Sequence, residues 1–546
     1  MNPPDQTADT IARIEQAARG ADRGMAINLA VEALKRGVRH PLIWTLVAEG
    51  LEGQGRLPEA LKLLQRATAL APDDARVWFG LGRVLFSLGR REEAGVALDR
   101  GLMISPDDYR GRIDAGTLWL RLSELKAASV HFQRAAEIAP EAAEPLSALA
   151  VVAGLAGDSA AARGAATRAL ALEPALISAQ IAIARADSLD GEPAQAAERL
   201  SGLLVRTDLA DAQRIDIHDL RAECLDTLGR PVEAFADYVA RNDVMRRVHA
   251  PSFAAAGWEG QGDRARRLAD WFEATPPGPW RSPASRVADA VGAPRLHAFL
   301  IGFPRSGTTL LEKALSSHPD IVSLEEVDVL GAVGNPLLAA DADLDRLVHM
   351  TAAESDALRE AYWRGVGEAM ETPIGSRIFI DKLPLHTPSL PLIARLFPDA
   401  RILFALRDPR DVVFSCFRRR FRINAGMFEF LTLDGAARYY DAVMRMAVAC
   451  RGVLPLAVHA VRHEAVVADF EGELGRALDF LGAPWNPDVR NFAALARTST
   501  RTLSAPQVAR GLNADGVAQW RRYQAQLAPI APILEPWVAR FGYDAD

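Results

Sequence analysis

Two different patterns of apolar and small residues divide the chain. As far as about residue 245, small and apolar residues repeat at a fixed step. From about residue 294, apolar runs typical of buried strands alternate with helical stretches. Four of these runs are predicted strands: 296–301, 377–380, 401–406 and 456–461. Such alternation favours a parallel sheet covered by helices, so we expect an α/β C-terminal half after a helical N-terminal half.

The N-terminal repeat has a period of 34 residues, and Ser123 fills one glycine slot. Its members are Pro72, Pro106, Pro140 and Pro174; Gly55, Gly89, Gly157 and Gly191; and Ala60, Ala94, Ala128, Ala162 and Ala196. This pattern resembles the tetratricopeptide repeat (TPR), in which helix pairs stack into an α-solenoid. We expect an N-terminal helix or cap over 1–24 and five to six repeats over 25–245. Their groove is predicted to hold a protein or peptide partner; a rigid spacer or dimerisation arm is the alternative.

A segment rich in proline, 275–283, separates the two halves. Its composition does not suit regular structure. Residues 246–293 are therefore expected to form a connecting helix and a linker, followed by a catalytic domain over 294–546.

A predicted strand, a compact loop and a helix start follow one another at 296–309. Free backbone N–H groups and the helix dipole make such a turn an anion site. Gly302 and Gly307 are spaced as in the phosphate loop of nucleotide triphosphatases, but Thr308 stands in the place of their Lys. Arg305 supplies a cation instead. The predicted phosphate-binding residues are Arg305, Ser306, Gly307, Thr308 and Thr309.

Two further segments place basic side chains after predicted strands. Arg407 follows the strand at 401–406 and precedes a helix that carries Ser415, and Lys382 follows R-I-F-I-D. Ligands of parallel sheets bind beyond the carboxyl ends of the strands. The three segments are therefore predicted to converge.

The segments P-R-S-G-T-T-L and R-I-L-F-A-L-R-D-P-R-D-V-V-F-S resemble the two phosphate sites of sulfotransferases that use 3′-phosphoadenosine-5′-phosphosulfate (PAPS). The likeness to tyrosylprotein sulfotransferases continues without a gap through S-S-H-P-D-I-V-S-L-E-E. It implies a PAPS-dependent sulfotransferase with a P-loop-like α/β domain. By resemblance, Glu326 is the catalytic base, Lys382 stabilises the bridging oxygen and Arg305 contacts the 5′-phosphosulfate. Glu325 is adjacent to the base, and His386 is the alternative base.

The resemblance also implies a set of donor-binding residues. Arg407 and Ser415 hold the 3′-phosphate, with help from Arg419. The segment 503–520 resembles a late loop that closes over the nucleotide, in which Ser504 also assists the transition state. This interpretation adds Gln507, Asn513 and His463 to the donor site. No metal is expected, because Lys and Arg supply the positive charge.

Several positions depart from the family pattern. His463 stands in place of a Tyr near the adenine, and Gln519 replaces a Lys that contacts the nucleotide. Asp328 and Ala332 occupy the positions of two peptide-binding Arg residues. An Asp there repels an acidic tyrosine peptide, so the expected acceptor is another hydroxyl of a protein, glycan or small molecule. We expect Arg418 and Arg420 to form a solvated basic face.

Composition narrows the partners and the location. A net charge of −7 over 546 residues argues against general nucleic-acid binding. No apolar run approaches the ~20 residues that span a bilayer. With three cysteines and no signal-like start, the cytoplasm is expected. Two other readings stay open: a nucleotide kinase or NTPase, and a TPR scaffold with an inactive donor-binding domain. A homodimer is also open.

Overall fold

The computed structural model of the chain describes residues 3–19, 23–254, 259–275, 280, 294–370, 372–498 and 504–544. The chain divides into two compact units, Met1–Leu209 and Ala210–Asp546. Most of the predicted 275–283 linker lies outside the described residues. The expected end of the repeats near residue 245 stays a prediction, since the compact units divide at an earlier point.

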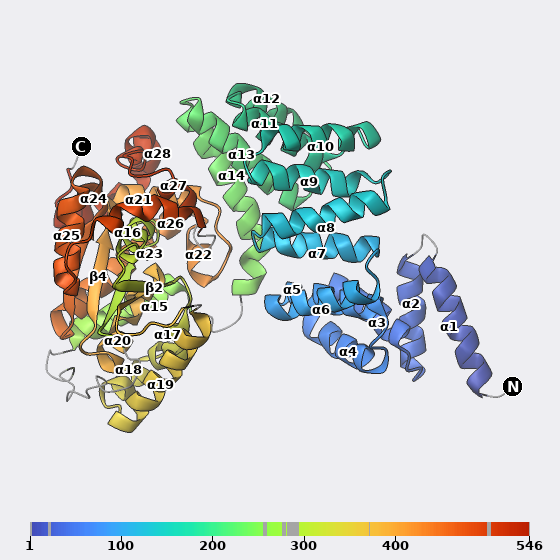
Figure 1. The fold of residues 1–546 in the computed structure, drawn as a ribbon, viewed down its shortest axis with the longest axis horizontal. Helices are drawn as coiled ribbons and strands as arrows, with labels where there is room; N and C mark the ends of the chain where they lie inside the picture. The colour runs from blue at the N-terminus through green and yellow to red at the C-terminus, as the bar shows by residue number, and fades with distance from the viewer. Residues whose placement is uncertain are drawn as a thin grey trace. The chain divides into compact units, whose positions relative to one another are not determined.

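The first unit is built from helices that pack in pairs, as the repeat predicts (Figure 1). Its helices are α1 Pro3–Arg19, α2 Arg23–Lys35, α3 Pro41–Gly53, α4 Leu57–Leu70, α5 Ala75–Ser87, α6 Arg91–Ile104, α7 Tyr109–Arg121, α8 Leu125–Ile138, α9 Ala143–Leu155, α10 Ser159–Leu172, α11 Ile177–Leu189 and α12 Pro193–Leu204.

The repeated residues have the structural roles that their types suit. All five repeated alanines are 0 % exposed, so the helices of each pair approach closely. The turn glycines have positive φ, and Ser123 adopts the same left-handed conformation with φ +64°. Each repeated proline stands two residues after a helix end, where it cannot continue the helix. The predicted α-solenoid is confirmed.

The second unit contains a five-stranded parallel sheet. Its strands are β1 Leu296–Gly302, β2 Ile321–Glu325, β3 Ile378–Lys382, β4 Arg401–Leu406 and β5 Ala457–Arg462, in the order β2-β3-β1-β4-β5. The four predicted strands are present within about two residues of their expected bounds. The edge strand β2 was not predicted, because only two of its five residues are buried and two are polar.

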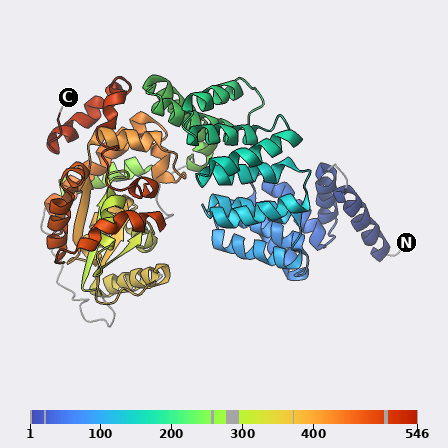
Figure 2. The ribbon, with the colours of Figure 1, turned by 45° about the horizontal axis from the view of Figure 1, so that its top comes forward.

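Helices cover both faces of this sheet (Figures 1 and 2). One face packs Leu300, Ile380 and Leu403 against α16 and α25. On the other face, Phe299 and Phe379 meet aromatic residues of α19. The remaining helices are α13 Asp211–Thr227, α14 Pro231–His249, α15 Gln261–Ala274, α16 Thr308–Ser316, α17 Val329–Gly334, α18 Asp341–Val348, α19 Ala352–Ala369, α20 Leu390–Leu396, α21 Pro409–Arg418, α22 Ala425–Glu429, α23 Leu433–Val453, α24 His463–Ala468, α25 Phe470–Leu481, α26 Phe492–Thr498, α27 Ala505–Val508, α28 Gln524–Leu527 and α29 Ala531–Arg540.

The helix pair α13–α14 belongs to the second unit. Its Arg241 is fully buried and donates hydrogen bonds to the backbone carbonyls of Phe417 and Arg418 at the end of α21. Because the last carbonyls of a helix have no partner within the helix, this contact caps α21. The last predicted repeat is therefore part of the body that contains the sheet.

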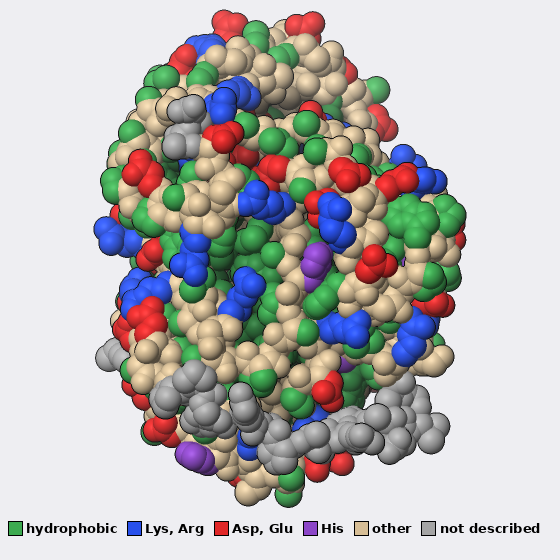
Figure 3. Space-filling view, turned by 90° about the vertical axis from the view of Figure 1, so that its left-hand side faces the viewer, with side chains coloured by type: hydrophobic (Ala, Val, Ile, Leu, Met, Phe, Trp, Pro, Cys, Tyr) green, Lys and Arg blue, Asp and Glu red, His purple; other side chains and the backbone are tan. Residues whose placement is uncertain are grey.

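The described surface carries charges of both signs. Lys and Arg side chains are interspersed with Asp and Glu on the face drawn in Figure 3. Among the helices described, none is long and apolar enough to cross a membrane. The cytoplasmic location stays a prediction.

Truncation tests where the second unit begins. A chain that starts at Ala210 is expected to keep the thermal transition of the second unit within a few degrees. A chain that starts at Ala250 loses it, because α21 then lacks its cap and Arg418, whose side chain is 11 % exposed, lacks the carboxylate of Asp226. Differential scanning calorimetry of the two chains measures this. Equal stability of both would contradict the unit boundary at Leu209.

Candidate active site

The loop between β1 and α16 has the backbone that its sequence predicts for an anion site. Gly307 precedes the first residue of α16 and has φ +92°. A Cβ at this position would lie 2.6 Å from Nδ1 of His463. Arg305 also has a positive φ, +73°. The backbone conformation and the close approach of His463 make this a position for glycine. The glycine leaves the N–H groups at the N-terminus of α16 accessible to an anion.

The Arg305 side chain connects three segments that are distant in sequence. Its Nε donates to Oγ of Ser415 at 3.0 Å, and its Nη2 donates to Oε1 of Gln507 at 2.8 Å. Its Nη1 donates to Oγ of Ser504. The structure therefore brings together four of the predicted site residues, from the loop, from α21 and from the late segment around α27.

Arg407 stands at the end of β4 and faces the same place. Its Nη1 donates to the carbonyl of Arg305 at 3.0 Å, and its Nη2 donates to the carbonyl of Gly516. Its Nε is buried and has no hydrogen-bond partner among the described residues, and the same holds for Nε of Arg419. Buried N–H groups normally have acceptors. These two orphaned donors fit a phosphate group.

A pocket forms where these segments meet, and we call it the strand-end pocket. It is lined by Arg305, Gly307, Thr309, Leu310, Arg407, His463, Ser504, Gln507, Val508, Arg510, Gly511, Leu512, Asn513, Asp515 and Gly516. Asn513 shapes its rim by donating to the carbonyl of Gly511 at 2.9 Å and accepting from the N–H of Asp515 at 3.2 Å. Ser306, Thr308, Ser415 and Arg419 are outside this lining. Ser306 and Thr308 are buried in the loop and the first turn of α16.

The electrostatics of the strand-end pocket favour an anion. Burial, reinforced by Arg419 and Arg407, lowers the pKa of Arg305 to about 9, so this side chain stays charged at neutral pH. Burial and the two arginines Arg407 and Arg305 also lower the pKa of His463 to about 3, which leaves its ring neutral. A bound phosphate would relieve the repulsion among these cations.

Glu326 and Lys382 lie at the carboxyl ends of the neighbouring strands β2 and β3. Nζ of Lys382 is 2.8 Å from Oε1 of Glu326, and the N–H of Glu326 donates to the carbonyl of Lys382 at 2.8 Å. Because β1 lies between β3 and β4, its loop is flanked by Lys382 on one side and Arg407 on the other. Neither Glu326 nor Lys382 lines the strand-end pocket itself.

The two adjacent carboxylates have different surroundings. Glu325 is ion-paired with Lys313 at 2.8 Å, and its side chain is 11 % exposed. The Glu326 side chain is 29 % exposed and bonds only to Lys382 among the ion pairs described. Lys313 also contacts Glu312 at 3.2 Å. Glu326 is therefore the more exposed of the two carboxylates, and its role as the base stays a prediction.

The alternative base, His386, is enclosed. Its Nε2 lies 3.1 Å from Oδ1 of Asp328, and its Nδ1 lies 3.6 Å from Oδ1 of the fully buried Asp381. Asp328 also accepts the N–H of Gly331 at the start of α17. These contacts give His386 and Asp328 a structural role at this strand end. They favour Glu326 over His386 as the base.

Two features of the site lay outside the sequence prediction. Lys313 was not singled out, because one Lys in a short helix gives no signal of an ion-paired partner. The prediction for Arg418 was wrong: its side chain is buried, 3.3 Å from Asp226, and it bonds to Gln519. Arg420 is exposed, as expected. Among the described residues, no group of His, Cys, Asp and Glu is arranged to hold a metal ion.

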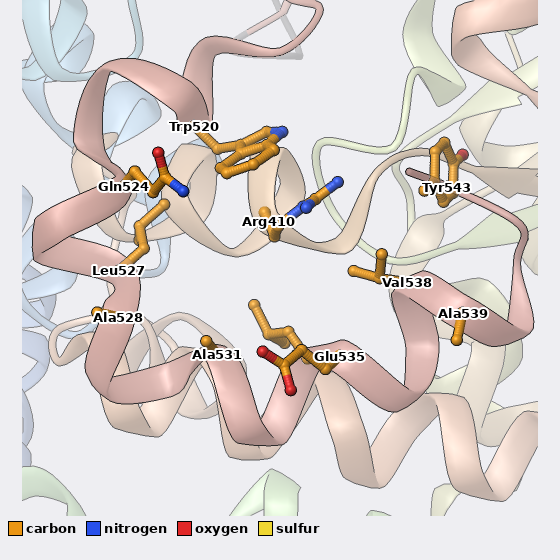
Figure 4. Close-up of a pocket in the computed structure, with 11 residues that line it drawn as sticks. Arg410, Trp520, Gln524, Leu527, Ala528, Ala531, Glu535, Val538, Ala539 and Tyr543 are labelled. Carbon is orange, nitrogen blue, oxygen red and sulfur yellow. The ribbon is translucent and has the colours of Figure 1, made fainter. Parts of the chain in front are cut away.

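A separate cavity of about 460 Å³ lies behind the late segment, between Trp520 and α29 (Figure 4). The guanidinium of Arg410 packs 3.7 Å from the centre of the Trp520 ring and is paired with Asp408. The backbone N–H of Trp520 donates to Asp411 of α21 at 2.9 Å. These contacts fasten the segment that carries Gly516 to the start of α21.

Comparison with known proteins agrees with this geometry. Residues 298–487 match the model of a sulfotransferase family, and residues 51–112 match a tetratricopeptide repeat model. The chain combines tetratricopeptide repeats with a domain of the sulfotransferase family. The resemblance drawn from the sequence is thus confirmed.

Three relatives match less than half of the chain at low identity. An uncharacterized protein of Aquifex aeolicus is 27 % identical over 255 residues, which are 43 % of this chain and 32 % of the relative. Protein-tyrosine sulfotransferase 1 of Danio rerio is 28 % identical over 262 residues, 45 % of this chain and 72 % of the relative. Protein-tyrosine sulfotransferase A of Caenorhabditis elegans is 26 % identical over 261 residues, which are 45 % of this chain and 67 % of the relative. The chain thus spans about a third of the length of the Aquifex relative.

Substitution of Gly307 tests the phosphate loop. Gly307→Ala is expected to weaken binding of 3′,5′-ADP at least about tenfold, because the new Cβ needs a strained φ and meets the His463 ring. Isothermal titration calorimetry measures the change. Gly452→Ala is the matched control, since a Cβ at Gly452 meets no atom within 4 Å. Unchanged affinity of Gly307→Ala would place the anion elsewhere.

Proposed function

We propose that the protein transfers the sulfuryl group of PAPS to an acceptor hydroxyl. The observation that carries this proposal is that an arginine cluster with two orphaned Nε donors and a carboxylate–ammonium pair converge at the carboxyl ends of neighbouring strands. Arg305, Arg407 and Arg419 form the cluster, and Glu326 and Lys382 form the pair. The membership of residues 298–487 in a sulfotransferase family supports it.

The donor would be held by groups that lie on both sides of β1. The N–H groups of the loop and Arg305 bind the 5′-phosphosulfate, with Ser504 beside Arg305. Arg407, Ser415 and Arg419 bind the 3′-phosphate, for which Nε of Arg407 and Nε of Arg419 are orphaned donors. His463 lies next to Gly307, where a neutral ring can pack on the nucleotide. A site built for two separate phosphate positions favours PAPS over ATP.

The transfer step assigns different tasks to Glu326 and Lys382. Glu326 takes the proton of the acceptor hydroxyl while the hydroxyl oxygen forms a bond to sulfur. The bond from sulfur to the bridging oxygen breaks, and 3′,5′-ADP leaves with the negative charge. Lys382 and Arg305 stabilise that charge. The ion pair of Glu326 with Lys382 opens for this step, because the ammonium group turns to the bridging oxygen.

The acceptor is proposed to be a hydroxyl outside acidic tyrosine peptides. Asp328 follows the base by two residues and adds negative charge where an acidic peptide would lie. In the first unit, a cavity of about 370 Å³ is lined by Arg23, Arg76, Arg83 and Arg110 and by Glu15, Glu49, Asp74 and Asp108. Its balanced charges suit a protein or peptide partner of mixed charge, which the repeats would recruit.

Removal of the base gives a direct test of its assignment. Glu326→Gln should lower kcat by roughly 10²–10⁴-fold, because proton removal is lost while the donor site is intact. The matched comparison is Glu325→Gln, whose carboxylate is committed to Lys313, and a smaller loss is expected there. Turnover with labelled PAPS and binding of 3′,5′-ADP are measured for both. A greater loss in Glu325→Gln would move the base to that residue.

Ligand-dependent unfolding tests the donor class. At ~100 times its dissociation constant a ligand adds about 2.7 kcal/mol of stability, which shifts the melting curve measurably. We expect 3′,5′-ADP to stabilise the protein, and 5′-AMP and ATP with Mg²⁺ to stabilise it far less. Stabilisation by ATP instead would indicate a nucleotide kinase or NTPase. No response to any of the three would indicate a TPR scaffold with an inactive domain.

A further inference from the structure

Helix α13 presents a row of carboxylates to the arginines around the end of α21. The row consists of Asp216, Asp219, Glu223 and Asp226, at spacings of three and four residues that put them on one helix face. Asp216 pairs with Arg420, Asp219 with Arg241, and Glu223 with Arg419. Asp226 pairs with Arg418 and with Arg522. The match to the sulfotransferase family model begins at residue 298, so it does not include this helix.

Asp226 has the most contacts of the row. Its Oδ2 lies 3.3 Å from Nη1 of Arg418, and its Oδ1 lies 2.7 Å from Nη2 of Arg522. The hydroxyl of Tyr523 also donates to its Oδ1, at 2.8 Å. This single carboxylate therefore joins the end of α21 to the segment that follows Gly516. The first segment carries Ser415 and leads into Arg419, and Gly516 before the second segment accepts a hydrogen bond from Arg407, so both adjoin the 3′-phosphate site proposed above.

Helix α14 fixes the same end of α21 through its backbone. The amide of Asn242 donates to the carbonyl of Phe417 at 3.0 Å, beside the two bonds that Arg241 donates to Phe417 and Arg418. Arg241 and Asn242 are both buried. Helix α14 therefore fixes the backbone just before Arg419. Helix α13 holds the side chain of Arg418, through Asp226.

The three consecutive arginines Arg418, Arg419 and Arg420 differ in how they contact the row of carboxylates. Arg418 is buried and held by Asp226, and Arg420 is exposed and held by Asp216. Arg419 has only the loose 3.9 Å contact with Glu223, and its Nε is orphaned. It is also the first of the neighbouring charges that lower the pKa of Arg305, so it lies close to the phosphate loop. The middle arginine is thus the one left for a ligand.

We propose that Asp226 is a positioning residue of the donor site, which sets Arg419 and the Gly516 segment around the 3′-phosphate without contacting the donor. The proposal rests on the proposed function. It makes the last helix pair of the repeat array part of the recognition of the donor, and it predicts that Asp226 governs discrimination between 3′,5′-ADP and 5′-AMP. The partners described for Asp226 do not include the phosphate loop at 303–307, so binding of the 5′-phosphate is expected to depend on Asp226 much less.

The test compares the affinities of full-length variants for 3′,5′-ADP and 5′-AMP by isothermal titration calorimetry. Asp226→Asn is expected to weaken 3′,5′-ADP about tenfold, which is the loss of one charge-assisted hydrogen bond, and 5′-AMP less than about twofold. Asp226→Glu restores most of the loss because it keeps the charge. Asp216→Asn is the matched control on the same face and leaves both affinities unchanged, since its partner Arg420 is exposed.

A second variant covers the case in which Asp226→Asn does not fold. Tyr523→Phe removes one hydrogen bond to Asp226 and no charge, and it is expected to weaken 3′,5′-ADP about threefold with 5′-AMP unaffected. Equal losses for both nucleotides, or no loss for either, would overturn the positioning role. If the wild-type protein itself does not distinguish 3′,5′-ADP from 5′-AMP, the proposed donor is wrong, and the positioning role has no phosphate to act on.

Discussion

The hydrogen bonds of the Arg305 guanidinium are the interaction on which the rest of the site depends. This group lies in a loop with a strained backbone, is half-buried, and bonds to side-chain oxygens from two other segments. Those oxygens are neutral, so they orient the cation without cancelling its charge. Arg407 bonds to two backbone carbonyls, and the buried carboxylate of Asp411 lies 3.7 Å from its Nη2. The fold thus concentrates positive charge in a place of low dielectric and leaves its neutralisation to a ligand.

At the ends of the neighbouring strands β2 and β3, by contrast, the charged side chains are paired with each other. Around Lys382, ammonium and carboxylate groups are paired within the protein, and Glu312, Glu325 and Glu326 outnumber the two lysines Lys313 and Lys382 by one. The excess negative charge falls on Glu326, the most exposed of the three. A parallel sheet allows such different environments to lie side by side. The carboxyl ends of its strands lie next to one another, but each strand is followed by its own set of side chains.

Local patterns made much of this predictable from the sequence. The 34-residue step, the glycine turns and the apolar runs each reflect contacts within or between adjacent elements. The phosphate loop and the residues after β4 are contiguous motifs, so they were found with their residues in place. The strand β2 was missed because an edge strand of five residues has little apolar signal. Arg418 was misjudged because a run of arginines resembles a surface. Its partner Asp226 is 192 residues away, and only the folded chain shows the pairing.

The division of the chain at Leu209 has an evolutionary consequence. In a solenoid each repeat contacts only its neighbours, so copies can be gained, lost or exchanged without disturbing distant parts. That freedom applies to the helix pairs before Leu209. The same freedom does not apply to α13–α14, because the buried side chains of Arg241 and Asn242 bond to the sheet-containing body. The number of helix pairs before Leu209 can therefore change without a change in the sheet-containing body, whereas a change in the final pair also changes that body.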